Sequence, residues 1–215
     1  MMEIRVPVGA GELSASVHGS GETVLLLGHG AGGTRKTPFL VRLAEAVAAS
    51  GRAVVLFNFP YADAGRRAPD RPPALEAAVR AACAHARGAL GARRLVLGGK
   101  SMGGRMASQV VAQGEPADGL LLLGYPLHPA GRSEKLRDAH LPSLRCPLLF
   151  VQGTRDALAR FDLMEPLARR LGATLHAVEG GDHSFAVPKR AGRTEGQVES
   201  EIAGAIVAWL GAHRL

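Results

Sequence analysis

The chain has 215 residues and a formal net charge of +7 at pH 7; 47% of its residues are hydrophobic and 21% are charged. This length and apolar share can bury one sizeable core, so we expect a single domain over residues 1–215. No apolar run approaches the ~20 residues of a membrane span, and the first residues lack the basic-then-apolar pattern of a signal peptide, so we expect a cytoplasmic protein without membrane contact.

The positive charge is carried mainly by arginines in small separate groups, such as Arg66 with Arg67 and Arg93 with Arg94. Aromatic residues make up only 4% of the chain, and none interleaves with a basic stripe. Proteins that bind nucleic acids combine a continuous basic surface with aromatic side chains for stacking. The pattern therefore favours a solvated arginine surface over a nucleic-acid interface.

Two segments at the start of the chain, residues 3–8 and 12–18, alternate in polarity around Gly9-Ala10-Gly11, which predicts an antiparallel hairpin. Short apolar runs typical of buried strands follow at 23–28, 53–58, 94–98, 119–124, 147–152 and 173–178. Ala-rich segments typical of helices lie between or after them, at 37–50, 72–90, 102–113, 162–171 and from Thr194. This alternation predicts a three-layer α/β fold, with a mostly parallel eight-stranded sheet covered by helices on both faces.

Local signals mark where several of these helices begin. Thr37 followed by Pro38 is typical of an N-cap and first turn, and Thr194 with Gln197 three residues later is typical of a capping box. The segments 59–71 and 125–146 are irregular, although 131–138 is a candidate short helix. A segment as short as 125–146 leaves no room for a large cap domain.

The most informative motif is Gly99-Lys100-Ser101-Met102-Gly103, which joins an apolar strand to a helical segment. A serine held at a sharp strand-to-helix turn exposes its hydroxyl, but the turn brings neighbouring chains close. Nearly side-chain-free residues are therefore needed two positions before and two after the serine. The pattern predicts a nucleophile elbow with Ser101 as the nucleophile.

Two phosphate-binding interpretations compete with the elbow. A phosphate-binding loop over Gly99-Lys100-Ser101 would need a glycine where Arg94 stands, inside the predicted strand. The run from Gly28 to Gly33 formally fits a dinucleotide-binding Gly-x-Gly-x-x-Gly. However, five residues separate this run from the next helix, and no acidic residue ends the following strand to bind a ribose. Both alternatives are disfavoured.

A serine nucleophile needs a base, a group that orients the base, and N–H donors for the oxyanion. We expect these on loops at the carboxyl ends of the strands. The loop Gly28-His29-Gly30-Ala31-Gly32-Gly33 predicts an oxyanion hole made by the N–H groups of Ala31 and Met102, with His29 bracing the loop.

Two further strand-end loops supply the partners of Ser101. Asp156 follows the run 147–152 and is the candidate orienting carboxylate, with capping of the next helix as its alternative role. His183 follows the run 173–178 on a Gly-rich loop and is the candidate base. Asp182 is a poor orienter of His183, because the side chains of adjacent residues usually diverge, so we expect it to brace the loop or to supply charge at the rim of the site. The chain order Ser101, Asp156, His183 is the order of the α/β hydrolases.

Metal and thiol chemistry have no sequence support. The chain contains no His-x-x-x-His or Cys-x-x-Cys spacing and no dense carboxylate group, so we expect no metal and no cofactor. Cys83 lies in an Ala-rich segment and Cys146 enters a strand, which favours two reduced core thiols over a disulfide.

Taken together, these motifs resemble the α/β-hydrolase superfamily over essentially the whole chain. More narrowly, the chain is similar to the small lidless dienelactone-hydrolase-like branch. Within that branch it resembles bacterial relatives of the testis-expressed-protein and NSL-complex hydrolase-like domains, through Lys100–Arg105 and the runs 57–61 and 125–129. The resemblance implies the fold, a Ser-His-Asp triad and hydrolase chemistry. Dienelactone hydrolases proper use a cysteine where this chain has Ser101, so dienelactone turnover is not implied.

The expected function is a serine hydrolase acting on a small or short-chain acyl substrate through an acyl-enzyme. Two alternatives stay open: a non-catalytic interaction module with this fold, and a peptidase or amidase. The short segment 125–146 predicts a shallow open site. We expect its walls to be Tyr61, Tyr125, Leu127, His128 and Phe185.

Overall fold

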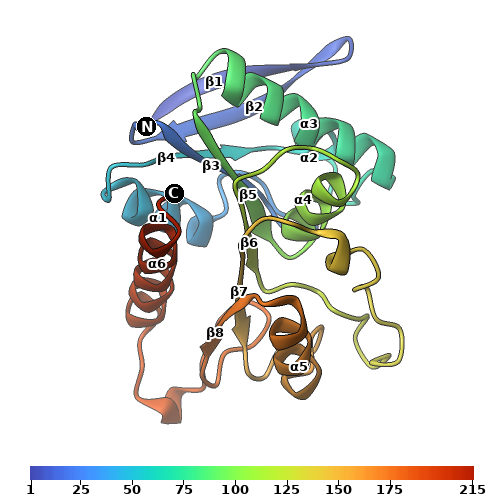
Figure 1. Cartoon of the computed structure of the whole chain (residues 1–215), viewed down its shortest axis with the longest axis vertical. Helices are drawn as coiled ribbons and strands as arrows, with labels where there is room; N and C mark the ends of the chain where they lie inside the picture. Colours follow the sequence, from blue (N-terminus) through green and yellow to red (C-terminus); the bar gives the residue numbers. More distant parts are fainter.

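The computed structural model describes all 215 residues and contains one eight-stranded sheet between two layers of helices (Figure 1). The strands are β1 (Met2–Val8), β2 (Gly11–His18), β3 (Thr23–Gly28), β4 (Ala53–Phe57), β5 (Arg94–Lys100), β6 (Gly119–Leu123), β7 (Leu148–Gly153) and β8 (Thr174–Val178). The helices are α1 (Pro38–Ala48), α2 (Pro60–Asp63), α3 (Pro72–Gly88), α4 (Met102–Ala112), α5 (Phe161–Leu171) and α6 (Glu195–Ala212), with short 3-10 turns η1 (Leu141–Ser143) and η2 (Lys189–Ala191).

The sheet has the strand order β1-β2-β4-β3-β5-β6-β7-β8. The hairpin of β1 and β2 is antiparallel, and β2 also pairs antiparallel with β4. All the other neighbouring strands are parallel. The predicted fold is therefore confirmed. The central strands β4 and β6 are buried at every position, which explains why they read as continuous apolar runs rather than as alternating ones.

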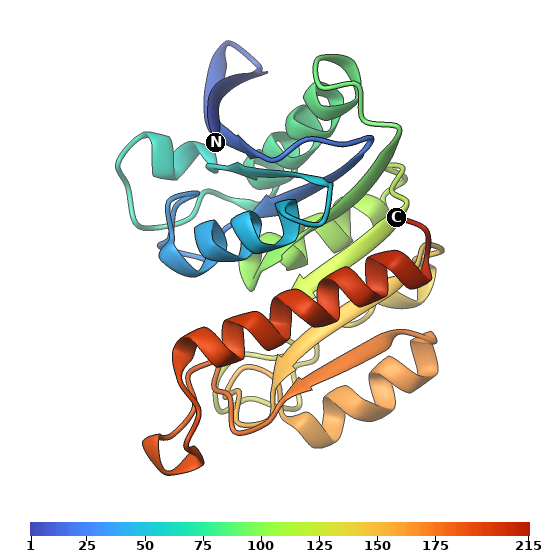
Figure 2. The same cartoon turned by 90° about the vertical axis from the view of Figure 1, so that its left-hand side faces the viewer.

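Helices α1 and α6 cover one face of the sheet, and α3, α4 and α5 cover the other (Figure 1). Figure 2 shows α1 and α6 lying over the sheet toward the viewer. Each face has its own core, one packed with residues of α1 and α6 and the other with residues of α3, α4 and α5. None of the helices combines the length and the apolarity that crossing a bilayer requires.

Most helix boundaries agree with the local signals. The capping box at Thr194 is confirmed, since its side chain accepts from Gln197 N–H while the Gln197 side chain accepts from Thr194 N–H. Thr37 precedes Pro38 as predicted, but its hydroxyl donates to Thr34 O at 2.7 Å instead of capping α1.

The irregular segments also hold different elements from those expected. Residues 131–138 form turns rather than the candidate helix, because so short a segment is a marginal helix without a packed face. Helical turns appear instead at α2 and η1, each with a proline at its first or second residue. No large cap covers the carboxyl ends of the strands.

A close backbone contact brings the end of β3 against the turn between β5 and α4. Gly28 pairs in register with Gly99. A Cβ on Gly99 would lie 2.1 Å from Gly28 O, and a Cβ on Gly103 would lie 2.2 Å from the same oxygen. No side chain fits at either position, so the two motif glycines are required by backbone packing.

We expect Gly103→Ala to lower the free energy of unfolding by about 1–3 kcal/mol or more, because its methyl group would overlap Gly28. Gly204→Ala is the matched control: Gly204 is an exposed position inside α6 with nothing within 4 Å of a built Cβ. There the methyl group should raise stability by about 1 kcal/mol, the ordinary helix-propensity gain. Denaturant unfolding of both variants tests the argument, which fails if the two substitutions have the same effect.

Candidate active site

Ser101 lies between the end of β5 and the first residue of α4, in a backbone conformation that only a sharp turn produces. Its φ is 50° and its ψ −110°, a rare region for a residue with a side chain. The Ser101 N–H donates to Leu123 O of β6 at 2.8 Å, which anchors the turn to the neighbouring strand. The serine therefore stands at the carboxyl edge of the sheet and at the N-terminus of a helix.

Two side chains from later loops complete a hydrogen-bond chain with this serine. His183 Nε2 lies 2.9 Å from Ser101 Oγ, and His183 Nδ1 lies 2.7 Å from Asp156 Oδ2. Asp156 is an acceptor, so Nδ1 carries the proton and Nε2 is free to accept from the serine hydroxyl. The structure thus brings together the three residues that the strand-end loops predicted.

Asp156 is held by two more donors in a dry environment. Its side chain is 0% exposed, and it accepts from Gln152 Nε2 at 2.5 Å and from Leu158 N–H at 2.7 Å. Helix α5 begins only at Phe161, after an N-cap at Arg160, so Asp156 does not cap it. The carboxylate is oriented toward His183 by the turn that follows β7.

The loop that carries His183 is closed by its neighbour Asp182. The Asp182 carboxylate accepts from the N–H groups of Ser184 and Ala186, at 2.8 Å and 3.0 Å. It makes no hydrogen bond to the His183 ring. The prediction that Asp182 braces the loop, and does not orient the base, is confirmed.

Lys100 is a feature of the site that motif analysis missed. Its Nζ donates to His183 O at 2.5 Å and lies 5.1 Å from the centroid of the Phe185 ring. Burial lowers the pKa of this ammonium to about 8, against the opposing attraction of Asp156 and Asp182. The sequence signal is the place of Lys100 directly before Ser101 at a strand end, where a long side chain can reach the loops that surround the serine.

The loop after β3 is organised around one carbonyl. Gly30 O accepts from His29 Nδ1 at 2.8 Å, from Gly33 N–H at 3.1 Å and from the Tyr61 hydroxyl at 3.3 Å. In a planar trans peptide the C=O of one residue and the N–H of the next point in opposite directions. Fixing this carbonyl therefore fixes the direction of the Ala31 N–H, which donates to no group of the protein.

His29 holds the same loop against the strand beside it. Its Nε2 accepts from Phe59 N–H at 3.1 Å, so the neutral ring donates at one nitrogen and accepts at the other. The side chain is buried, and burial lowers the pKa of His29 below its ordinary value. The predicted bracing role of His29 is confirmed by these contacts.

A cavity of about 420 Å³ opens beside Ser101. Its lining residues are Gly30, Ala31, Gly33, Thr37, Phe39, Lys100, Ser101, Leu158, His183 and Ser184. Met102, the second predicted oxyanion donor, is the first residue of α4, where an N–H has no partner within its own helix.

Four of the five predicted wall residues do not line either this cavity or its neighbour and are buried elsewhere: Tyr61, Tyr125, Leu127 and His128. The Tyr61 hydroxyl holds Gly30 O, and the Tyr125 hydroxyl donates to Arg137 O at 2.6 Å. His128 Nε2 accepts from Arg160 N–H at 2.9 Å, so this ring braces the segment before α5. Leu127 belongs to the core that packs on α5, and Phe185 borders a neighbouring cavity.

A family model described as an alpha/beta hydrolase domain matches residues 21–211, which is most of the chain. The chain belongs to the α/β-hydrolase family. The sequence resemblance to this superfamily is thereby confirmed; the narrower similarity to the testis-expressed-protein and NSL-complex relatives stays a prediction.

Solved structures of other α/β hydrolases share the fold at low sequence identity. A serine hydrolase without a lid from Xanthomonas campestris is 19% identical, with TM-score 0.75 over 98% of this chain and 94% of that one. A dienelactone hydrolase from Anabaena variabilis is 18% identical, with TM-score 0.72 over 98% and 96%. A cold-adapted esterase from an Arctic intertidal metagenomic library is 21% identical, with TM-score 0.68 over 98% and 92%.

The structure of this α/β hydrolase contains no arrangement of side chains that would support a metal site, a reactive thiol or a dinucleotide site. No group of three or more His, Cys, Asp or Glu side chains is arranged to hold a metal ion. Both cysteines are free, and burial raises the pKa of the Cys83 thiol to about 12. The helix that follows β3, α1, begins only at Pro38, so it does not start within the Gly28–Gly33 run as the phosphate helix of a dinucleotide site does.

We expect the stability of the protein to fall as the pH drops from 7.5 to 5, in part through His29. Its pKa is lower in the folded state, so the unfolded state binds more protons below the ordinary histidine pKa of about 6.5. The stabilisation is present above that pH and is lost as the pH falls through the folded-state value. In His29→Gln the difference in unfolding free energy between pH 7.5 and 5 should shrink, whereas the exposed-site control His213→Gln should keep it. An unchanged difference in His29→Gln would contradict the argument.

Proposed function

We propose that this α/β hydrolase is a serine hydrolase of small or short-chain acyl substrates, with carboxylesterase-like activity. The observation that carries the proposal is the continuous hydrogen-bond chain from Ser101 through His183 to the buried Asp156, at the edge of a cavity. A neutral imidazole positioned in this way can take the proton of a serine hydroxyl as the hydroxyl attacks a carbonyl carbon.

In the proposed reaction, His183 Nε2 accepts the Ser101 proton while Ser101 Oγ forms a bond to the acyl carbon. Asp156 keeps the ring in the required tautomer and stabilises the imidazolium. The tetrahedral intermediate collapses when His183 gives its proton to the leaving alcohol oxygen, which leaves an acyl-enzyme. Water, deprotonated by His183, then attacks the acyl carbon and releases the acid and the free serine.

The N–H groups of Ala31 and Met102 are the proposed oxyanion donors. Ala31 lines the cavity with an unpartnered N–H, and Met102 begins a helix whose N-terminus favours negative charge. His29 and Tyr61 act through the carbonyl of Gly30, which they hold, so they are positioning residues. This arrangement needs no metal and no cofactor.

Two alternatives are weaker on specific grounds. A non-catalytic module has no need of a strained serine in line with a buried carboxylate and a histidine. A peptidase or amidase would use the same triad, and the esterase among the structural neighbours favours an ester substrate. A panel of ester, thioester and amide substrates, with Ser101→Ala as control, separates these reactions.

We expect stoichiometric labelling of the wild-type protein by a fluorophosphonate, because the probe reacts with an activated serine. Ser101→Ala should not label and should lose several orders of magnitude in kcat toward p-nitrophenyl acetate, judged by other triads. Ser200→Ala, at an exposed position of α6, should label as the wild type does. A folded wild-type protein that neither labels nor shows an acyl-enzyme burst would falsify the hydrolase proposal.

The two neighbouring carboxylates should behave differently. Asp156→Asn should lower kcat by about 10⁴-fold, because an amide at this position favours the wrong tautomer of His183. Asp182→Asn keeps the oxygen that accepts from Ser184 and Ala186, so its kcat should stay within a few-fold of the wild type. Steady-state kinetics at pH 7 on both variants test the assignment, and the reverse order of effects would overturn it.

A further inference from the structure

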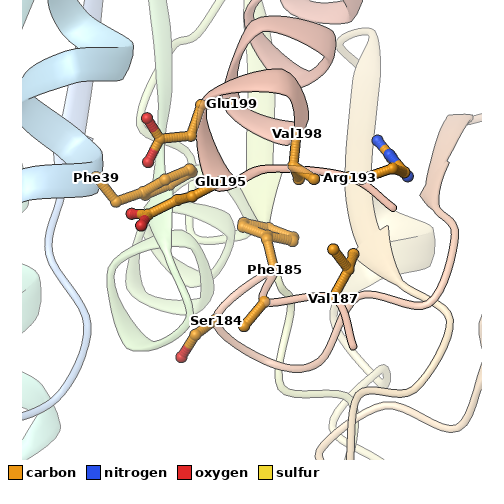
Figure 3. A pocket seen from close by; sticks show the side chains of 9 residues that line it. Phe39, Ser184, Phe185, Val187, Arg193, Glu195, Val198 and Glu199 are labelled. Atoms are coloured by element: carbon orange, nitrogen blue, oxygen red, sulfur yellow. The ribbon is translucent and has the colours of Figure 1, made fainter. Parts of the chain in front are cut away.

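A second cavity of about 300 Å³ lies near the one at Ser101, and Figure 3 shows the side chains that line it. It is lined by Phe39, Ser184, Phe185, Ala186, Val187, Arg193, Glu195, Val198 and Glu199. Two of these residues, Phe39 and Ser184, also line the cavity beside Ser101. The two spaces are therefore neighbours across a shared wall, and we call the second one the outer cavity.

The outer cavity lies on the base side of the proposed active site. Its wall begins at Ser184, the residue directly after His183, and continues through Phe185 to Val187. The base of a serine hydrolase must reach the oxygen of the leaving group to protonate it. A leaving alcohol on the His183 side of Ser101 would therefore have the outer cavity on its own side of the site.

The apolar part of this wall is built around Phe185. The Phe185 and Phe39 rings are 5.4 Å apart between centroids, and Val187 and Val198 lie beside Phe185 (Figure 3). Phe185 has a φ of +66°, which is unfavourable for a bulky side chain. The bond from its N–H to Asp182 O, at 2.9 Å, holds this conformation. Such strain, maintained by neighbouring contacts next to a reactive group, is typical of functional loops.

The charged side chains at the rim are already paired. Glu195 and Glu199 both bind Arg42 of α1, at 2.5 Å and 2.6 Å, and Arg193 pairs with Glu201. No lining charge is left without a partner of opposite sign. The outer cavity therefore favours an uncharged, apolar group over an anion or a cation.

We propose that the outer cavity is the alcohol subsite of the enzyme, and that it takes a neutral aryl or branched alkyl alcohol; this rests on the proposed acyl transfer at Ser101. The size fits such a group, since an engineered apolar cavity of about 150 Å³ in another protein binds benzene. A volume of about 300 Å³ has room for a phenyl ring with a short alkyl chain that leads back to the ester oxygen.

Two acetate esters test the subsite with a common acyl group. Ethyl acetate and 2-phenylethyl acetate form the same acetyl-enzyme, so a difference in kcat/KM between them reports only on the alcohol portion. We expect the wild-type protein to prefer 2-phenylethyl acetate by at least tenfold. In Val187→Trp, where an indole at a half-buried loop position fills the outer cavity, that preference should fall by at least tenfold. Leu136→Trp, which adds the same group at an exposed position away from both cavities, should keep it.

A second measurement needs no variant. 2-Phenylethanol should inhibit ethyl acetate hydrolysis by the wild-type protein competitively, and at a concentration at least tenfold lower than ethanol. If both esters are hydrolysed but Val187→Trp leaves the preference unchanged, or 2-phenylethanol inhibits no better than ethanol, the alcohol subsite is overturned while the hydrolase stands. If the folded wild-type protein hydrolyses neither ester and does not label with fluorophosphonate, the proposed function itself fails.

Discussion

The site depends on one close backbone contact, the approach of Gly28 to the turn that carries Ser101. Gly99 and Gly103 both face the carbonyl of Gly28 at distances that no side chain allows. The contact joins the end of β3 to the start of α4, and it therefore sets where the loop after β3 lies relative to the serine. A methyl group at either glycine would push the loop after β3 and Ser101 apart, so the geometry of the site rests on these three residues.

Hydrogen bonds from polar groups then hold the two loops that lie on either side of Ser101. The loop after β3 has one carbonyl held by three donors, and its direction fixes that of the Ala31 N–H. On the opposite side of Ser101, the Lys100 ammonium and the Asp182 carboxylate hold the loop of His183. Most of these contacts are to backbone atoms, so the groups that touch the reacting atoms are positioned by residues that do not.

Sequence reasoning located the three candidate site residues because the physical rule behind it is simple. Parallel strands end at the same edge of the sheet, so polar residues that follow successive strands meet there. The rule placed Ser101, Asp156 and His183 together without any knowledge of side-chain direction. It did not identify Lys100, whose role depends on a contact with a carbonyl 83 residues away in the chain.

Several features are determined by the sequence, because each depends on local propensity or on a short spacing. They are the fold class, the chain order of the three candidate site residues on strand-end loops, the glycines of the turn and the capping box of α6. The walls of the site were decided by tertiary packing alone. Tyr61, Tyr125 and His128 stand in strand-end loops, as cavity residues do, yet each turns inward to satisfy a backbone group. Phe39 and Ser184 line the cavity instead. Loop position follows from the order of the strands, but the direction of a side chain follows from which buried polar groups need a partner.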